Sequence, residues 1–279
     1  MKTKTVIAVS RTERFSPHSE ARDRAIYENA CAELEARGFD VVQVAEDSIG
    51  AGRLSSGFYL SMARSNRALE FLRREEERGA VVVNSPSVLI TINRFLLAEK
   101  FSQAGINVPQ TEVMNSVSGP SLNYPFWVKN INPFTRDEHD VAFISSEKDF
   151  EAYRQDSASR HDISTIAEEH IEGDLIKFYG VGEGFFYYYY PTSDQSFRGK
   201  FNNESVNGAP HNISFDKEEL LRLCGRASGV IGLPVYGGDA VIGRDGNIYI
   251  VDFNDFPSFG ACRKMAAKAI ADYIETKYF

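Results

Sequence analysis

The first third of the chain alternates between the hydrophobic spacing of strands and that of helices, and this order limits the folds open to it. Short apolar runs alternate with stretches that carry apolar residues three or four apart, and these stretches end at Gly38 and Gly79. The predicted elements are a strand at 5–10, a helix at 18–37, a strand at 41–44, a helix at 60–78 and a strand at 80–83. A strand–helix–strand order implies a small parallel sheet, so the chain predicts an α/β fold.

Length and composition exclude several classes of protein. The chain has 279 residues, 43% of them hydrophobic and 25% charged, which is enough for a sizeable core. No apolar run approaches the roughly 20 residues of a membrane helix, and the apolar stretch at 6–9 is interrupted by Arg11 too early for a signal peptide. A net charge of -8 disfavours nucleic acid, because phosphate contacts dominate nucleic-acid affinity. We therefore expect a soluble, cytoplasmic protein that binds neither membranes nor nucleic acid.

A cluster of polar residues follows the first predicted strand. Arg11, Thr12, Arg14 and His18 come soon after residues 5–10, and ligands of open α/β sheets gather at the carboxyl ends of the strands. Guanidinium groups at such a place suit an anionic substrate. Ordinary surface arginines on a solvated loop explain the same residues equally well. The sequence leaves these two interpretations open.

The rest of the chain predicts further strands and helices. A run of six aromatic residues at 185–190 has no alternation, which favours a strand covered on both faces over a base-stacking surface. Asp216 followed by Glu219 gives a helix N-cap with a carboxylate three residues on. The predicted helices are 88–104, 216–231 and 260–277, and the predicted strands are 125–130, 141–144, 164–171, 175–181, 185–190, 235–242 and 248–253.

The candidate chemistry concentrates in the last predicted pair of strands. Asp239 lies on the first strand of the pair, and Asp252 and Asn254 lie two residues apart on the second, so period-two alternation puts the latter two on one face. Magnesium takes oxygen ligands and usually completes its octahedral shell with water and nucleotide phosphates. Two carboxylates and an amide fit such a metal, although the spacing alone also fits a solvated face.

Four ordered segments, which together cover about residues 84–259, resemble the ATP-grasp enzymes. The stretches 237–242 and 248–257 resemble the metal-binding end of that family, in which an acid, then an acid and an asparagine two apart, hold magnesium on the triphosphate. The other three segments are Asn93-Arg94, similar to an Asp-Lys pair near a phosphate; Phe126-Trp127-Val128-Lys129, similar to the strand whose lysine reaches the nucleotide; and 167–174, similar to the hinge that cups adenine.

This resemblance implies two cofactors, ATP and Mg²⁺, and gives roles to the matching residues. Asp239, Asp252 and Asn254 would hold the metal, and Glu172 or Asp174 would lie near the ribose. The implied ATP-binding residues are Arg94, Lys129, Glu168, Glu169, His170, Ile171, Glu172, Asp174 and Lys177. The implied fold is the ATP-grasp fold, with a small parallel α/β N-terminal lobe at 1–85 followed by two α+β lobes, 86–166 and 167–279, that hold ATP between them.

The sequence resembles two branches of the family that have different activities. Residues 254–259 and the glycine-poor segment 129–144 are most similar to inositol phosphate kinases, whereas 198–203 resembles the phosphate-reaching loop of ligases that add glutamate. We prefer a ligase that joins a small carboxylic acid to an amine through an acylphosphate, because an acidic chain suits a polyphosphate substrate poorly. A kinase for a polyol or an inositol phosphate is the alternative. The implied catalytic cations are Arg94, Lys129, Arg198 and Lys200.

The segment 133–140 stands where many ATP-grasp enzymes have a glycine-rich lid, and it contains no glycine. Arg136 and His139 then do the lid's work with side chains, or turnover is slow or lost, which would leave a nucleotide-binding module without catalysis. Small-molecule substrates would be selected by the first lobe, and the candidate substrate-binding residues are Arg11, Arg14, Arg64 and Arg67. The sequence does not identify the acid or the amine, and it leaves a homodimer open.

Overall fold

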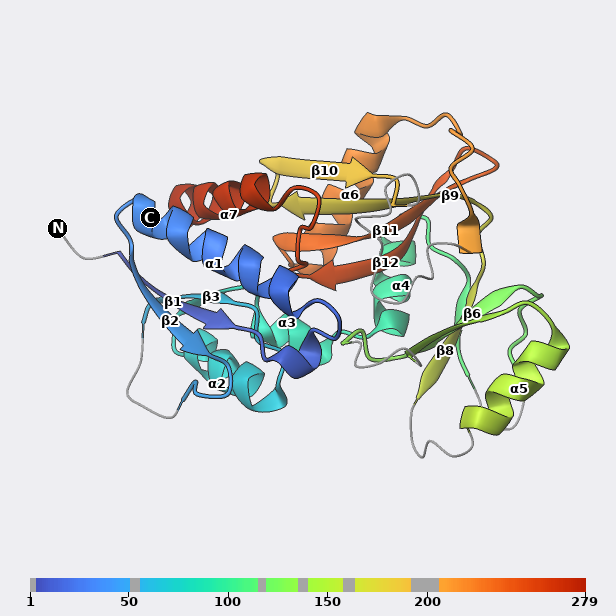
Figure 1. Cartoon of the computed structure of the whole chain (residues 1–279), viewed down its shortest axis with the longest axis horizontal. Helices are drawn as coiled ribbons and strands as arrows, with labels where there is room; N and C mark the ends of the chain where they lie inside the picture. The colour runs from blue at the N-terminus through green and yellow to red at the C-terminus, as the bar shows by residue number, and fades with distance from the viewer. Residues whose placement is uncertain (1–3, 51–55, 115–118, 135–139, 158–163, 192–205) are drawn as a thin grey trace.

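The described residues form three four-stranded sheets that follow one another along the sequence (Figure 1). The computed structural model describes residues 4–50, 56–114, 119–134, 140–157, 164–191 and 206–279. Within those ranges, no helix combines the length and the hydropathy that crossing a bilayer requires.

All strand pairings in the first sheet are parallel, as the strand–helix order predicts. Its strands are β1 (Thr5–Ser10), β2 (Asp40–Ala45), β3 (Phe58–Ser61) and β4 (Val81–Val83), in the order β2-β1-β3-β4. Helix α1 (Glu20–Ala36) connects β1 to β2, and α2 (Asn66–Glu77) connects β3 to β4; a short 3-10 helix, η1 (Glu13–Phe15), follows β1.

Strand β3 corrects the expectation that a helix begins near Leu60. Phe58, Tyr59 and Leu60 are almost fully buried inside the sheet. Helix α2 begins only after Ser65, whose side chain accepts a hydrogen bond from the backbone N–H of Ala68. A short apolar run directly before a helix cannot be assigned to strand or helix by its spacing alone, which is why the strand was missed.

The second sheet is antiparallel, in the order β5-β8-β6-β7. Its strands are β5 (Thr111–Val113), β6 (Phe126–Asn130), β7 (Val141–Ile144) and β8 (Thr165–Glu169). Helix α5 (Glu147–Ser157) packs against β7; of the two helices that precede the sheet, α3 (Pro86–Thr91) contacts α2, and α4 (Arg94–Gln103) contacts β5 and α6 (Lys217–Ile231). The single helix expected at 88–104 is two helices, because Asn93 adopts an extended backbone and caps α4. Two further elements were not predicted: β5 is too short to show alternation, and α5 buries only Phe150.

The third sheet is antiparallel and carries a helix on each face. Its strands are β9 (Gly173–Val181), β10 (Phe185–Tyr189), β11 (Val235–Gly243) and β12 (Ile248–Asp255), in the order β10-β9-β11-β12, and its helices are α6 (Lys217–Ile231) and α7 (Arg263–Tyr278). The aromatic run is covered on both faces as expected, since alternate residues pack toward α7 and toward α6. Its strand is nevertheless only half-buried, because β10 lies at the edge of the described sheet.

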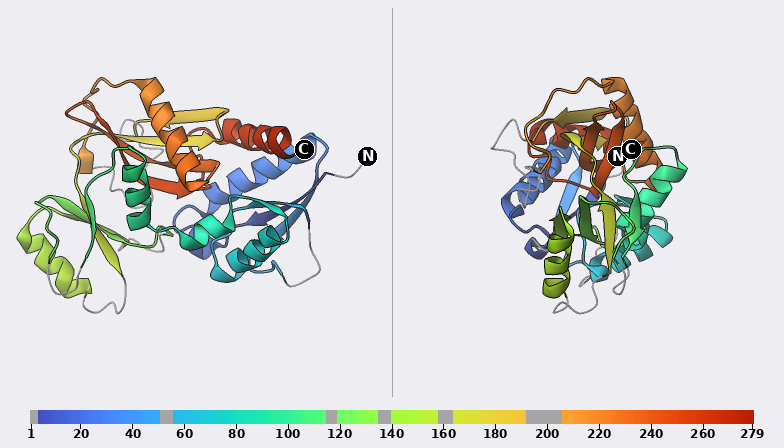
Figure 2. Two further views of the ribbon diagram at one scale, coloured as in Figure 1. Left: turned by 180° about the vertical axis from the view of Figure 1, so that it is seen from behind. Right: turned by 90° about the vertical axis from the view of Figure 1, so that its right-hand side faces the viewer.

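Helix α7 lies against α1 of the first lobe, so the two ends of the chain share one core (Figure 1). Ile26 of α1, Ile270 and Ile274 of α7 and Val235 of β11 belong to a single hydrophobic cluster. Asn84 joins the same two sheets, because its Nδ2 donates to the Val235 carbonyl at 2.7 Å and its Oδ1 accepts from the Val235 N–H at 3.0 Å. The second sheet has a separate cluster and lies at the other end of the molecule (Figure 2).

Replacing Ile270 by alanine tests this shared core. The side chain is fully buried, so Ile270→Ala should lower the free energy of unfolding by about 2 to 5 kcal/mol, as measured by urea denaturation. Lys264→Ala on the exposed side of the same helix is the control and should change it by less than about 0.5 kcal/mol. Equal effects of the two variants would contradict the packing of α7 against α1.

Candidate functional site

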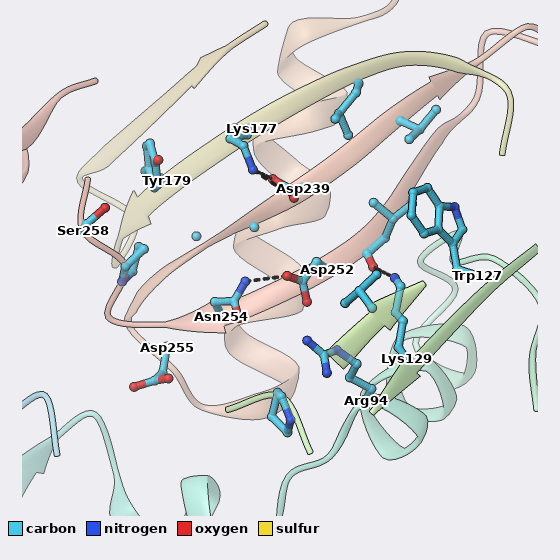
Figure 3. Close-up of a pocket in the computed structure, with 18 of the residues that line it drawn as sticks. Arg94, Trp127, Lys129, Lys177, Tyr179, Asp239, Asp252, Asn254, Asp255 and Ser258 are labelled. Atoms are coloured by element: carbon cyan, nitrogen blue, oxygen red, sulfur yellow. Dashed lines mark hydrogen bonds and ion pairs between the residues drawn. The ribbon is translucent and has the colours of Figure 1, made fainter. Parts of the chain in front are cut away.

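A cavity of about 320 Å³ lies between the second and third sheets and extends to the first lobe. Residues of β6 and β8 line one side, and residues of β9, β11 and β12 line the other (Figure 3). Arg22 and Asp23, at the start of α1, also line the cavity. The residues predicted from the sequence that line it are Arg11, Arg64, Arg94, Lys129, Glu168, Glu169, His170, Ile171, Lys177, Asp239, Asp252 and Asn254.

Two carboxylates face each other across β11 and β12. The strand register places Asp239 directly opposite Asp252, just before a register shift in the pair. Asn254 shares the face of Asp252 and donates from Nδ2 to its Oδ2 at 2.7 Å. Gly238 permits this close pairing, because a Cβ added there would lie 2.1 Å from the Asp252 carbonyl oxygen.

Three cations surround these acids. Lys177 lies opposite Asp239 on β9, and its Nζ is 2.8 and 3.1 Å from the two carboxylate oxygens. The Nζ of Lys129 contacts the Glu168 carboxylate and donates to the Val251 carbonyl at 3.1 Å, which links the second sheet to the third. Arg94 donates to the carbonyl of Asn130, the last residue of β6, at 2.7 Å and to that of Asn132 at 2.9 Å.

The charges change the acidity of two carboxyl groups in opposite directions. Burial alone would raise the pKa of Asp252, but the positive charges of Arg94 and Lys129 and the hydrogen bond from Asn254 lower it below its ordinary value. Burial raises the pKa of Glu168, although Lys129 beside it opposes the rise. Asp252 is therefore ionised at neutral pH while part of its surface is open to the cavity.

These residues fit a magnesium ion. Asp239, Asp252 and Asn254 offer only oxygen ligands, and the ammonium of Lys177 already bridges both oxygens of Asp239, which shows that a positive charge is stable there. The described part of the chain contains no cluster of three His, Cys, Asp or Glu side chains able to hold a metal by themselves. Two carboxylates and one amide leave most of an octahedral shell to water and phosphate oxygens, the kind of shell that magnesium keeps.

Four predicted residues do not reach the cavity. Glu172 is exposed and pairs with Arg244, and Arg14 is exposed beside Asp47. Arg67 donates to two backbone carbonyls of the loop after β2, those of residues 47 and 49. Strand alternation points Asp174 away from the face that carries Leu175 and Lys177. The predicted Arg198 and Lys200, like Arg136 and His139, lie outside the described residues.

Arg11 and Arg64 line the cavity but pair with carboxylates of the protein itself. Arg11 Nη1 lies 3.0 Å from Asp23 Oδ2, and Arg64 Nη2 lies 2.5 Å from Asp255 Oδ1. All four side chains are almost fully buried, and burial, followed by the charge of Arg11, lowers the pKa of Arg64 to about 10. This network holds the first lobe on the end of β12, a role that the sequence did not indicate.

Sequence reasoning also missed several residues that line the cavity. Tyr179 lies two residues beyond Lys177 on β9, and Trp127 lies two residues before Lys129 on β6. Period-two alternation would have placed both beside a predicted residue. No comparable local signal exists for Ser19, Arg22, Tyr189, Asn207 and Ser258, which reach the cavity only through tertiary packing.

Asp174 anchors a loop, and its acidity predicts how stability depends on pH. It accepts hydrogen bonds from the backbone N–H groups of His211 and Ile213 at 2.6 and 2.8 Å. Burial opposes ionisation, but these bonds prevail and lower the pKa of Asp174 below its ordinary value. A depressed folded-state pKa contributes stability that is present above the unfolded-state pKa of about 4 and is lost as the pH falls through the folded-state value.

Asp174→Asn should therefore lower the free energy of unfolding by about 1 to 3 kcal/mol at pH 7, with a smaller difference from wild type at about pH 3. Urea denaturation at a series of pH values measures this. The exposed acid Asp216 caps α6, so Asp216→Asn, which keeps a capping oxygen, serves as a control with little effect. A difference that stays constant with pH would contradict the assignment.

Comparison with known proteins gives a consistent result for the fold. No protein-family model and no curated protein sequence matches the chain. Among solved structures, a RimK-domain ATP-grasp protein from Sphaerobacter thermophilus has a TM-score of 0.67 at 18% identity, and the match covers 97% of this chain and 99% of that one. The ATP-grasp ligase PsnB, complexed with a minimal precursor, has a TM-score of 0.63 at 16% identity, with 99% of both chains covered.

A third structure extends the likeness to a different ligase. D-alanine–D-alanine ligase from Bacillus anthracis, complexed with ATP, has a TM-score of 0.66 at 12% identity, and the match covers 99% of this chain and 97% of that one. All three likenesses span nearly the whole chain, from the parallel first sheet to helix α7. This chain has the ATP-grasp fold.

Proposed function

We infer that the protein is an ATP- and magnesium-dependent ligase that joins a small carboxylic acid to an amine through an acylphosphate. One observation carries this proposal: the oxygen ligands Asp239, Asp252 and Asn254 and the cations Arg94, Lys129 and Lys177 line a single cavity. Acids that attract a metal and cations that attract phosphate are both needed to hold a metal–triphosphate complex.

The structural neighbours support the hypothesis of a ligase over that of a nucleotide-binding module without catalysis. PsnB, named an ATP-grasp ligase, has been solved with magnesium and ADP, and D-alanine–D-alanine ligase has been solved with ATP. At 12 to 16% identity these likenesses concern the fold, so the proposal rests on the side chains that this chain keeps in its own cavity.

The proposed roles follow from position in the cleft. Asp239, Asp252 and Asn254 would hold magnesium, which neutralises phosphate charge when bound. Arg94, Lys129 and Lys177 would contact the phosphates, and Glu168 would keep Lys129 in place. The nucleotide base would lie along Glu169, His170 and Ile171. Arg198 and Lys200 remain proposed phosphate contacts from the sequence alone.

The proposed reaction needs no nucleophilic side chain. A carboxylate oxygen of the substrate attacks the terminal phosphorus of ATP, the bond to the bridging oxygen breaks and ADP leaves. The amine then attacks the carbonyl carbon of the acylphosphate, inorganic phosphate leaves and the nitrogen loses a proton to water. The protein contributes mainly position and electrostatics. The acid would enter beside the first lobe, where Arg11 and Arg64 line the cavity together with the carboxylates that pair with them.

Asp252→Asn tests the metal site. The amide keeps the shape but loses the charge that binds the cation, so ATP turnover should fall by at least about a hundredfold while the thermal unfolding temperature changes little. Asp245→Asn makes the same exchange at the exposed turn of the same hairpin and should leave turnover unchanged. Wild-type turnover in Asp252→Asn would remove that carboxylate from the proposed site.

Measuring ADP and inorganic phosphate together separates ligase from kinase. The wild-type protein is incubated with ATP, magnesium, pooled small carboxylic acids and amines, and in parallel with pooled polyols. A ligase releases ADP and phosphate in equal amounts, because the amine displaces phosphate from the acylphosphate. ADP without free phosphate would favour a kinase instead, and ATP binding without either product across broad pools would favour a non-catalytic module.

A further inference from the structure

Three aromatic rings from the second sheet meet at one end of the cavity. Trp127 on β6 is paired in register with Phe143 on β7, and His170 follows directly after β8. The ring centroids are 4.9 Å apart for Trp127 and Phe143, 5.2 Å for Phe143 and His170, and 6.0 Å for Trp127 and His170. Trp127 and His170 line the cavity, and Figure 3 shows Trp127 at the end away from Tyr179 and Ser258.

A hydrogen bond fixes which nitrogen of His170 carries the proton. The indole Nε1–H of Trp127 can only donate, and it lies 3.1 Å from Nδ1 of His170. Nδ1 must therefore present its lone pair, and the neutral imidazole carries its proton on Nε2. Burial lowers the pKa of His170 below its ordinary value although Glu172 opposes this, so the ring is neutral at pH 7. His170 is thus held as a donor at Nε2.

The cavity around these two rings suits a flat heterocycle. Five aliphatic residues also line the cavity: Val141, Ile171, Leu175, Val241 and Val251. Lys129 lies two residues from Trp127 on the same face of β6, and its Nζ contacts the carbonyl of Val251. A ligand that placed a ring beside Trp127 and His170 would therefore direct an attached phosphate chain toward the cations.

We propose that His170 recognises the nucleotide base by donating a hydrogen bond from its Nε2 to an acceptor nitrogen of a purine ring. Trp127 is the positioning residue, because its hydrogen bond to Nδ1 keeps the proton of His170 on Nε2. This inference rests on the ATP-dependent function proposed above and adds its base-specificity residue. A base nitrogen that accepts this bond should matter to affinity only while His170 is present, because the two form one interaction.

The test pairs nucleotide analogues with protein variants. ATP is compared with 1-deaza-, 3-deaza- and 7-deaza-ATP, each of which replaces one ring acceptor by C–H. Trp127 is the only tryptophan of the chain, so its emission reports binding without any catalysis. One of the three analogues should bind the wild-type protein about tenfold more weakly than ATP does, which is the scale of a lost hydrogen bond that leaves a buried donor unpaired. The same analogue and ATP should bind the His170→Phe variant with equal affinity.

Two further variants separate the hydrogen bond from ring packing. Phe143→Leu removes a ring contact but keeps the bond between Trp127 and His170, so it should preserve the discrimination between analogues. Trp127→Phe should reduce the discrimination between analogues, because the His170 proton can then move between the two ring nitrogens. The nucleotide affinities of this variant are measured by calorimetry. Nitrogen-15 shifts of the His170 ring should show the Nε2-protonated tautomer in the wild type and a mixture in Trp127→Phe.

Each possible result either supports or contradicts the role proposed for His170. If ATP binds the wild type but all three analogues bind equally well, or if His170→Phe keeps the same discrimination, His170 does not read the base. A ring protonated on Nδ1 in the wild type would overturn the role of Trp127. If ATP itself does not bind, the proposed ATP-dependent function fails, and this inference fails with it.

Discussion

The pairing of β11 between β9 and β12 decides where the charges of this cavity lie. The register places Lys177, Asp239 and Asp252 side by side across three strands. The opposite face of the same strands carries Phe178, Ala240 and other residues that pack under α6. A slip of one residue would turn the charged row into that core, where unpaired charges are strongly unfavourable. The hydrophobic face therefore fixes the geometry of the acidic site.

The same packing explains why the cavity lies between the second sheet and the unit formed by the first and third sheets. The first and third sheets share a core through α1 and α7, whereas the second sheet packs around its own cluster. At the boundary, Lys129 pairs with Glu168 in its own sheet and donates to Val251 in the third. Polar contacts of this kind can be exchanged for contacts with a ligand at smaller cost than a packed apolar interface.

A second set of buried charges lies where the first lobe meets β12. Arg11 and Arg64 face Asp23 and Asp255, so the network is balanced in formal charge. Removing one member of such a network leaves an uncompensated buried charge, which makes the arrangement specific even where its net contribution to stability is small. It also fixes the position of Asp255, directly after the proposed metal ligand Asn254.

Local patterns in the sequence determined the parallel first sheet, most of the strands and the placement of Asp239, Asp252 and Asn254 on one hairpin, because alternation and turn chemistry are properties of neighbouring residues. Tertiary structure decided the rest. Asp255, which pairs with both Arg11 and Arg64, comes from the other end of the chain, and the faces of Arg14 and Asp174 depend on which side of each element meets the cavity. Spacing along a strand shows which residues share a face, but only the packing of distant elements decides which face becomes the core and which becomes the site.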